Sequence, residues 1–212
     1  MNKKRFLPVL LLTLLLCLSG CGQEPQISYP SQPEQPTEIP ATQAGEQDQY
    51  KTDPVPEGKP QPVEPQNAQV TDSAYTCTLS ISCATILDNM DLVEAQKKPL
   101  VPADGWLLPE TTVTFYQGES VFDVLLRVCK ENKLHMEYMD TPMYNSAYIE
   151  GIGNLYEFDV GPLSGWMYHV NGWFPNYGCS RYALQDGDVV CWVYTCDLGS
   201  DVGDNSMGGQ QP

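Results

Sequence analysis

GWMYHVNGWFPNYG, residues 165–178, is the most informative stretch of this 212-residue chain. Trp166, Tyr168 and Val170 alternate with smaller or more polar residues, which predicts a half-buried strand. Asn171-Gly172 follows at once and is the strongest short-range signal for a β-hairpin, because both central positions of its turn need positive φ. The stretch therefore predicts two antiparallel strands joined by a tight turn.

A second strand signal lies just downstream, in DVVCWVYTC, residues 188–196. It follows the turn dipeptide Asp186-Gly187 and is apolar on both faces. Strands that are apolar on both faces are covered on both sides by protein. We therefore expect this strand to be central in its sheet.

Upstream of these strands, one helix is predicted over residues 120–131. Ser120 can cap it with Asp123 three positions later, and Val121, Leu125 and Val128 form an apolar stripe. Three further strands are predicted, at 75–87, 111–117 and 134–139. Loops are predicted at 88–110 and 140–164, and the second loop is expected to contain a short strand near Tyr156 and Phe158. This order predicts an α+β fold, a β-grasp-like mixed sheet with one main helix.

The N-terminus has the pattern of a secretory signal. Lys3, Lys4 and Arg5 precede an apolar run over residues 6–18, which is shorter than the roughly 20 residues that a membrane span needs. The ending Leu18-Ser19-Gly20-Cys21 is similar to the bacterial lipobox. That resemblance implies cleavage after residue 20, a lipid on Cys21 and anchoring at the extracellular face of the bacterial cell membrane. The alternative is an ordinary signal peptide with a chance cysteine.

Residues 21–71 have a different composition from the rest. Ten prolines lie between Pro25 and Pro65 among Gln, Glu, Thr and Ser, with no apolar period. Such a segment buries too little surface to offset its chain entropy, so we expect a disordered linker. A ligand for a proline-reading domain is the alternative. The folded domain is then expected over residues 72–204, with a flexible tail at 205–212.

Charge excludes one class of partner. The chain has 11 Lys and Arg residues, three of them in the signal, against 27 Asp and Glu, so the mature chain has a formal charge of −19. Nucleic acid is not an expected partner, because phosphate binding depends on clustered Lys and Arg. Direct adsorption to anionic lipid is disfavoured for the same reason.

Six cysteines remain in the mature domain: Cys77, Cys83, Cys129, Cys179, Cys191 and Cys196. No C-x-x-C pair occurs and only two histidines are present, so we expect no metal site. In an exported domain disulfides are expected. Strand spacing excludes pairing of Cys77 with Cys83 and of Cys191 with Cys196, and the other connectivities stay open. Free thiols in an anaerobic habitat are the alternative.

The sequence carries no G-x-S-x-G, paired-histidine or Cys–His signature, so we expect a protein that is not an enzyme and needs no cofactor. The aromatic side chains of the opening stretch are the candidate ligand-binding residues. Trp173, Phe174 and Tyr177 follow the tight turn, where Pro175 ends the strand early and favours exposure. Trp166 and Tyr168 complete the set, with a core position as their alternative.

Four segments resemble the transcobalamin-like C-terminal domain family: GESVFDVL (118–125), GIGNL (151–155), the opening stretch and DGDVVCWVYTCDLG (186–199). The resemblance covers roughly residues 75–203. It implies a β-grasp-like fold and a place among surface lipoproteins and other exported proteins of Gram-positive bacteria. It also implies a distant relation to the corrinoid-contacting small domain of animal cobalamin carriers.

The expected function is therefore an extracellular, lipid-anchored domain that captures a corrinoid (a cobalamin-like molecule) or another small molecule. The alternative is an adhesion module that binds a surface protein or a cell-wall glycan and has no small-molecule ligand. Capture needs a concave aromatic pocket, whereas adhesion needs a flat exposed aromatic patch.

Overall fold

The structure is a computed structural model that describes residues 45–204. The predicted signal peptide (1–20), the lipid site at Cys21, the linker up to residue 44 and the tail 205–212 lie outside the described residues. Within residues 45–204, no helix is long and apolar enough to cross a membrane.

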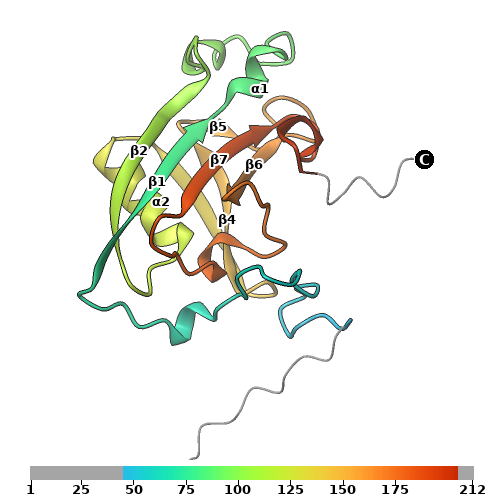
Figure 1. Cartoon of the computed structure of the whole chain (residues 1–212). Coiled ribbons are helices and arrows are strands. Elements are labelled where there is room, and N and C mark those ends of the chain that lie inside the picture. Colours follow the sequence, from blue (N-terminus) through green and yellow to red (C-terminus); the bar gives the residue numbers. More distant parts are fainter. Residues whose placement is uncertain (1–44, 205–212) are drawn as a thin grey trace, which may run out of the picture. The chain divides into compact units, whose positions relative to one another are not determined.

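The larger sheet has four strands in the order β2-β1-β7-β6 (Figure 1). They are β1 (Ala74–Ser82), β2 (Trp106–Tyr116), β6 (Gly165–Val170) and β7 (Val189–Thr195). β1 and β7 run parallel to each other, and each edge strand runs antiparallel to its neighbour. The predicted mixed sheet is thus confirmed, with the 188–196 segment in the interior of the sheet.

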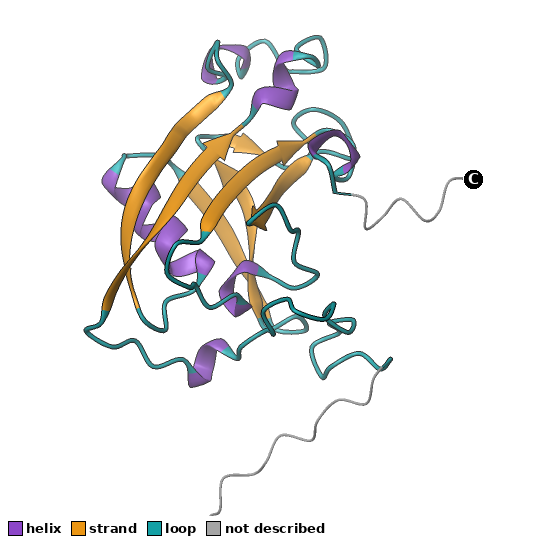
Figure 2. Cartoon of the chain, in the orientation of Figure 1, coloured by secondary structure: helices purple, strands orange, loops and turns teal. Residues whose placement is uncertain are grey.

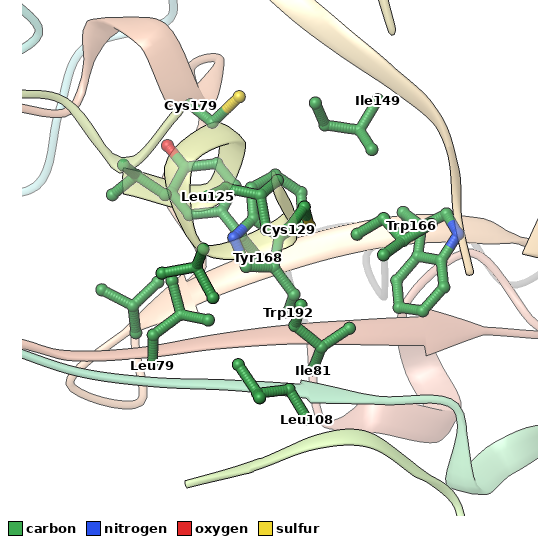
Figure 3. Close-up of a cluster of buried hydrophobic side chains, with 14 of the residues drawn as sticks. Leu79, Ile81, Leu108, Leu125, Cys129, Ile149, Trp166, Tyr168, Cys179 and Trp192 are labelled. Atoms are coloured by element: carbon green, nitrogen blue, oxygen red, sulfur yellow. The ribbon is translucent and has the colours of Figure 1, made fainter. Parts of the chain in front are cut away.

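The main helix, α2 (Val121–Glu131), has the predicted capping box. The Asp123 N–H donates to Ser120 Oγ at 3.2 Å, and the Ser120 N–H donates to the Asp123 carboxylate at 2.8 Å. These bonds satisfy two of the N–H groups that a helix start leaves unpaired. Figure 3 shows that Leu125 and Cys129 of this helix lie in the same buried cluster as Trp192 of β7.

A second sheet of three strands, in the order β3-β4-β5, completes the core: β3 (Met136–Thr141), β4 (Ser146–Ile152) and β5 (Leu155–Tyr156). β4 lies inside the predicted loop 140–164, where one short strand was expected near Tyr156 and two strands are found. Gly151 accounts for the missed strand, because a glycine normally weakens a strand. Here the Tyr156 ring lies over it, and a Cβ would come within 2.8 Å of that ring.

The two strand boundaries that differ most from the prediction do so for local reasons. β2 begins at Trp106, although Pro109 favours a loop; β2 is an edge strand, where the missing proline N–H costs no ladder bond. β1 ends at Ser82, because the chain turns there into α1 (Ala84–Leu87). The remaining helical segments are single 3₁₀ turns: η1 (Pro65–Asn67), η2 (Lys98–Leu100), η3 (Cys179–Arg181) and η4 (Ser200–Val202).

The Asn171-Gly172 turn has the predicted backbone, with φ of 52° and 74°. Val170 and Trp173 exchange two main-chain hydrogen bonds across it, at 2.9 and 3.0 Å. The predicted return strand, however, is reduced to this one bridge. Pro175 has no N–H to donate, so it cannot extend the ladder, and the chain leaves the sheet edge.

All six described cysteines are free thiols, so the expected disulfides are not found. Four of them are buried in the core, where a thiol packs as a small apolar side chain. Burial raises the pKa of Cys77 and Cys83 to about 11, and of Cys129 and Cys179 to about 12. The core thiols are therefore held in the unreactive protonated form at neutral pH.

Candidate functional site

Two of the five predicted ligand-binding residues lie in the core (Figure 3). Trp166 and Tyr168 are only 8% and 9% exposed. The Trp166 Nε1–H donates to the Leu155 carbonyl at 2.8 Å, and the Tyr168 hydroxyl donates to the Tyr177 carbonyl at 2.8 Å. Both side chains are thus committed to the fold and have little surface to offer a ligand.

The other three form a loop over residues 173–177, which we call the aromatic loop. Its Tyr177 ring is buried, 6.0 Å from the Trp173 ring and stacked at 6.2 Å on Tyr182. Trp173 itself is only partly exposed. The structure therefore brings Trp173 and Tyr177 together, edge to face, in a short row of rings.

Phe174 is separate from this row of rings and packs on His169 of β6. Its ring lies 4.9 Å from the ring of His169, whose Nδ1 is buried without a hydrogen-bond partner. His169 lies on the face of β6 opposite Tyr168 and is partly buried under Phe174. Burial lowers its pKa below the ordinary value of 6.5, so the imidazole is neutral at pH 7.

A segment that was expected to be part of the disordered linker covers the aromatic loop. Residues 45–66, which we call the strap, run along the domain as an irregular chain that ends in η1 (Figure 2). The Tyr177 hydroxyl donates to the Pro60 carbonyl at 2.7 Å, and Lys59 Nζ lies 5.4 Å from the centre of the Trp173 ring. The ordered part of the chain thus begins well before the predicted boundary at residue 72.

Arg181 explains why the strap is ordered. Its side chain is 1% exposed, and its guanidinium donates to Asp48 at 2.6 Å, to Glu64 at 3.0 Å and to Thr52 Oγ1 at 2.5 Å. The ring of Tyr50 lies 5.1 Å from the guanidinium carbon. All four partners belong to the strap. Because a buried charge is costly unless it is paired and hydrogen-bonded, Arg181 fixes this otherwise polar segment.

The stability that the Asp48–Arg181 contact contributes should depend on pH. Burial would raise the pKa of Asp48, but hydrogen bonds from Arg181 and from the N–H groups of Thr52 and Tyr50 outweigh it and lower the pKa below 3.8. A carboxyl with a lowered folded-state pKa stabilises the fold above its unfolded pKa, and this contribution is lost as pH falls through the folded value. We expect the stability difference between the native chain and Asp48→Asn to be constant above about pH 5 and to shrink below pH 3.8.

Urea unfolding of both chains between pH 6 and pH 2 measures this difference. A difference that stays constant down to pH 2 would contradict a charged contact between Asp48 and Arg181.

The most exposed large side chains of the second sheet lie on the β3–β4 hairpin and form what we call the hairpin patch. Its members are Met139, Met143, Tyr144 and Tyr148, which are 49%, 64%, 53% and 42% exposed. Met139 and Tyr148 are direct cross-strand partners, and Met143 and Tyr144 form the hairpin tip. The sequence signals for this patch were hidden in the predicted loop.

A shallow hollow of about 280 Å³ lies between this hairpin and the strap. Its lining residues are Pro65, Asp140, Thr141, Pro142, Asn145, Ser146, Ala147 and Ser180, none of which is aromatic. Ligand pockets usually measure about 300–1,000 Å³, so the hollow fits one side chain or one sugar ring better than a large cofactor. Within residues 45–204, no three His, Cys, Asp or Glu side chains are grouped as metal ligands.

One protein family matches the chain, over less than half of its length. Residues 118–196 match the family described as Domain of unknown function (DUF4430). This range runs from the start of α2 to the end of β7 and contains the aromatic loop. No curated protein matches the chain.

Two solved structures are similar to parts of the chain. One is haptocorrin in complex with Cbi, with 15% identity and a TM-score of 0.45 over 60% of this chain and 26% of that one. The other is described as "a putative metal binding protein from Ruminococcus gnavus", with 15% identity and a TM-score of 0.35 over 57% of this chain and 96% of that one. The chain thus spans about a quarter of haptocorrin.

Proposed function

We propose that this protein is a lipid-anchored interaction module at the extracellular face of a bacterial cell membrane. It binds a surface protein or a cell-wall glycan through the hairpin patch and performs no catalysis. The observation that supports this proposal is the patch itself. Four large side chains, Met or Tyr, lie exposed on one hairpin, and gathered exposure of this kind is typical of binding surfaces.

The geometry supports this reading more strongly than corrinoid capture by a transcobalamin-like domain. Capture needs a concave aromatic site, and of the five predicted aromatic residues Trp166, Tyr168 and Tyr177 are buried. The hollow beside the hairpin has no aromatic lining. A patch of exposed Tyr and Met next to a small hollow is better suited to a flat partner, with one side chain or sugar ring of that partner in the hollow.

Binding to isolated cell walls tests the proposal. We expect a chain of residues 22–212, which lacks the lipid site, to sediment with Gram-positive cell-wall sacculi. The double substitution Met143→Ser and Tyr144→Ser should weaken this binding at least about tenfold, as at an interface hot spot. Tyr116→Ser is the control, because Tyr116 is an exposed tyrosine like Tyr144 but lies on the other sheet.

Protease-treated sacculi distinguish the two kinds of partner, because a glycan survives the treatment and a protein does not. Titration with cobinamide, followed by absorbance, tests small-molecule capture in parallel. Saturable cobinamide binding without any binding to sacculi would replace the proposed function by corrinoid capture.

A further inference from the structure

The strap is held to the domain mainly by polar contacts, with Val55 partly buried against the core. Of residues 45–66, only Thr52 is buried. A main-chain hydrogen bond joins the strap to the domain, from the Val63 N–H to the Arg181 carbonyl at 2.9 Å. Since buried apolar surface supplies most of the free energy that orders a chain, a segment held in this way is readily detached.

The surface under the strap combines a cation with aromatic rings. Arg181 binds the strap carboxylates, and the neighbouring Tyr177 hydroxyl binds the carbonyl of Pro60 in the sequence Lys59-Pro60-Gln61-Pro62. Aromatic side chains that hydrogen-bond the carbonyls of extended proline-rich chains are a recurring mode of peptide recognition. The surface under the strap can therefore bind two features of one segment, its carboxylates and its proline-rich backbone.

The strap leaves one strong donor of this surface unused. Arg181 Nε is buried and has no hydrogen-bond partner, although both terminal nitrogens of the guanidinium are bonded. A buried N–H without a partner costs roughly 1–3 kcal/mol. A segment that brought a carboxylate within reach of Nε would satisfy this donor, which the strap leaves unpaired.

We propose that Arg181, Trp173 and Tyr177 form a recognition site for extended, proline-rich polypeptide segments that carry carboxylates. The strap occupies this site in cis and competes with any such segment of another polypeptide. Residues 22–44 of the chain have the same composition, with five prolines and three glutamates, so a neighbouring copy is one source of such a segment. A tethered competitor acts at an effective concentration of about millimolar, which keeps the site closed to weak ligands.

A labelled synthetic peptide of residues 45–66 tests this site by fluorescence anisotropy with a chain of residues 22–212. We expect weak binding to the native chain, because its own strap competes. Asp48→Asn with Glu64→Gln in the protein weakens the strap and should tighten peptide binding at least about tenfold. Arg181→Gln added to this double variant should abolish the gain.

The matched control is Asp53→Asn with Glu57→Gln, two exposed strap carboxylates that do not contact Arg181. This chain should bind the peptide as the native chain does. The proposal is overturned if the Asp48 and Glu64 variant, folded by its melting curve, gains no affinity. It is also overturned if a peptide with the same two amides binds as tightly as the unaltered peptide.

A second measurement needs no substitution in the protein. In the ¹⁵N-labelled native chain, a large excess of peptide should raise hydrogen exchange of residues 48–64, because the strap is displaced. Exchange that does not change at any peptide concentration would show that the site accepts no second segment.

Discussion

Replacing Trp166 by alanine is expected to lower the free energy of unfolding by about 3–5 kcal/mol. The indole is 8% exposed, bonded through Nε1 to the Leu155 carbonyl, and packed edge to face on Tyr194 at 5.2 Å. Its loss removes a large apolar surface, a hydrogen bond and an aromatic contact from the core together. Urea unfolding of the mature chain, followed by circular dichroism, measures the effect.

Trp106→Ala is the matched control for this experiment. Trp106 is the same residue type in the same sheet, but it is 42% exposed at the start of β2. We expect its substitution to cost less than about 1 kcal/mol. If both substitutions cost the same small amount, Trp166 would not be a core residue, and its predicted role in ligand binding would have to be considered again.

Removal of the strap is expected to have the second large effect. A chain that begins at residue 72 should unfold with about 2–4 kcal/mol less free energy than one that begins at residue 45, because Arg181 loses its charge-assisted hydrogen bonds. Asp48→Ala with Glu64→Ala should cost about as much in the longer chain, since without these carboxylates the strap detaches. The stability lost in this double variant cannot exceed the free energy of strap docking. Once the strap detaches, water reaches Arg181 and hydrates its charge.

Two comparisons test this reasoning. Asp53→Ala with Glu57→Ala, in the longer chain, should change stability by less than about 0.5 kcal/mol, since surface substitutions rarely do more. Asp48→Ala with Glu64→Ala in the longer chain should lower the free energy of unfolding by no more than truncation to residue 72 does, because both changes break the same contact. Equal stability of the two chain lengths would instead mean that the strap contributes nothing to the domain.

The parts of the fold that could be predicted from sequence have local causes. The helix over 120–131 was predicted within one residue, because its capping box and apolar stripe are both contained in that segment. The turn at Asn171-Gly172 and the central β7 strand were predicted for the same reason. Each signal depends on residues that are neighbours in the sequence.

The parts that could not be predicted depend on contacts between distant residues. Gly151 favours a loop until the Tyr156 ring is seen to lie over it. The strap has the composition of a disordered chain, and its contacts with residues more than 100 positions away, above all with Arg181, order it. The one signal available was that Arg181 is one of only two arginines in the mature chain, in a protein with a large excess of carboxylates.

The candidate site also has parts that the sequence could predict and parts that it could not. Aromatic content pointed to Trp173 and Tyr177, which do lie together, but it could not show that the strap covers them. Alternation along the strand would have placed Trp166 and Tyr168 in the core, which was the alternative for these two residues. Most of the hairpin patch could not be predicted, because Gly151 made the β4 segment look like part of a loop.

The position of the strap has a mechanical consequence. In the proposed lipid-anchored protein, any pull between a bound partner and the membrane passes through the N-terminal end of the strap. The load then meets the Asp48 contact first and the Glu64 contact last, so the bonds break one after another, as in peeling, and at low force. Release of residues 48–64 would lengthen the tether by up to about 55–60 Å while the two sheets stay folded. The strap would thus serve as an extensible element that yields before the domain does.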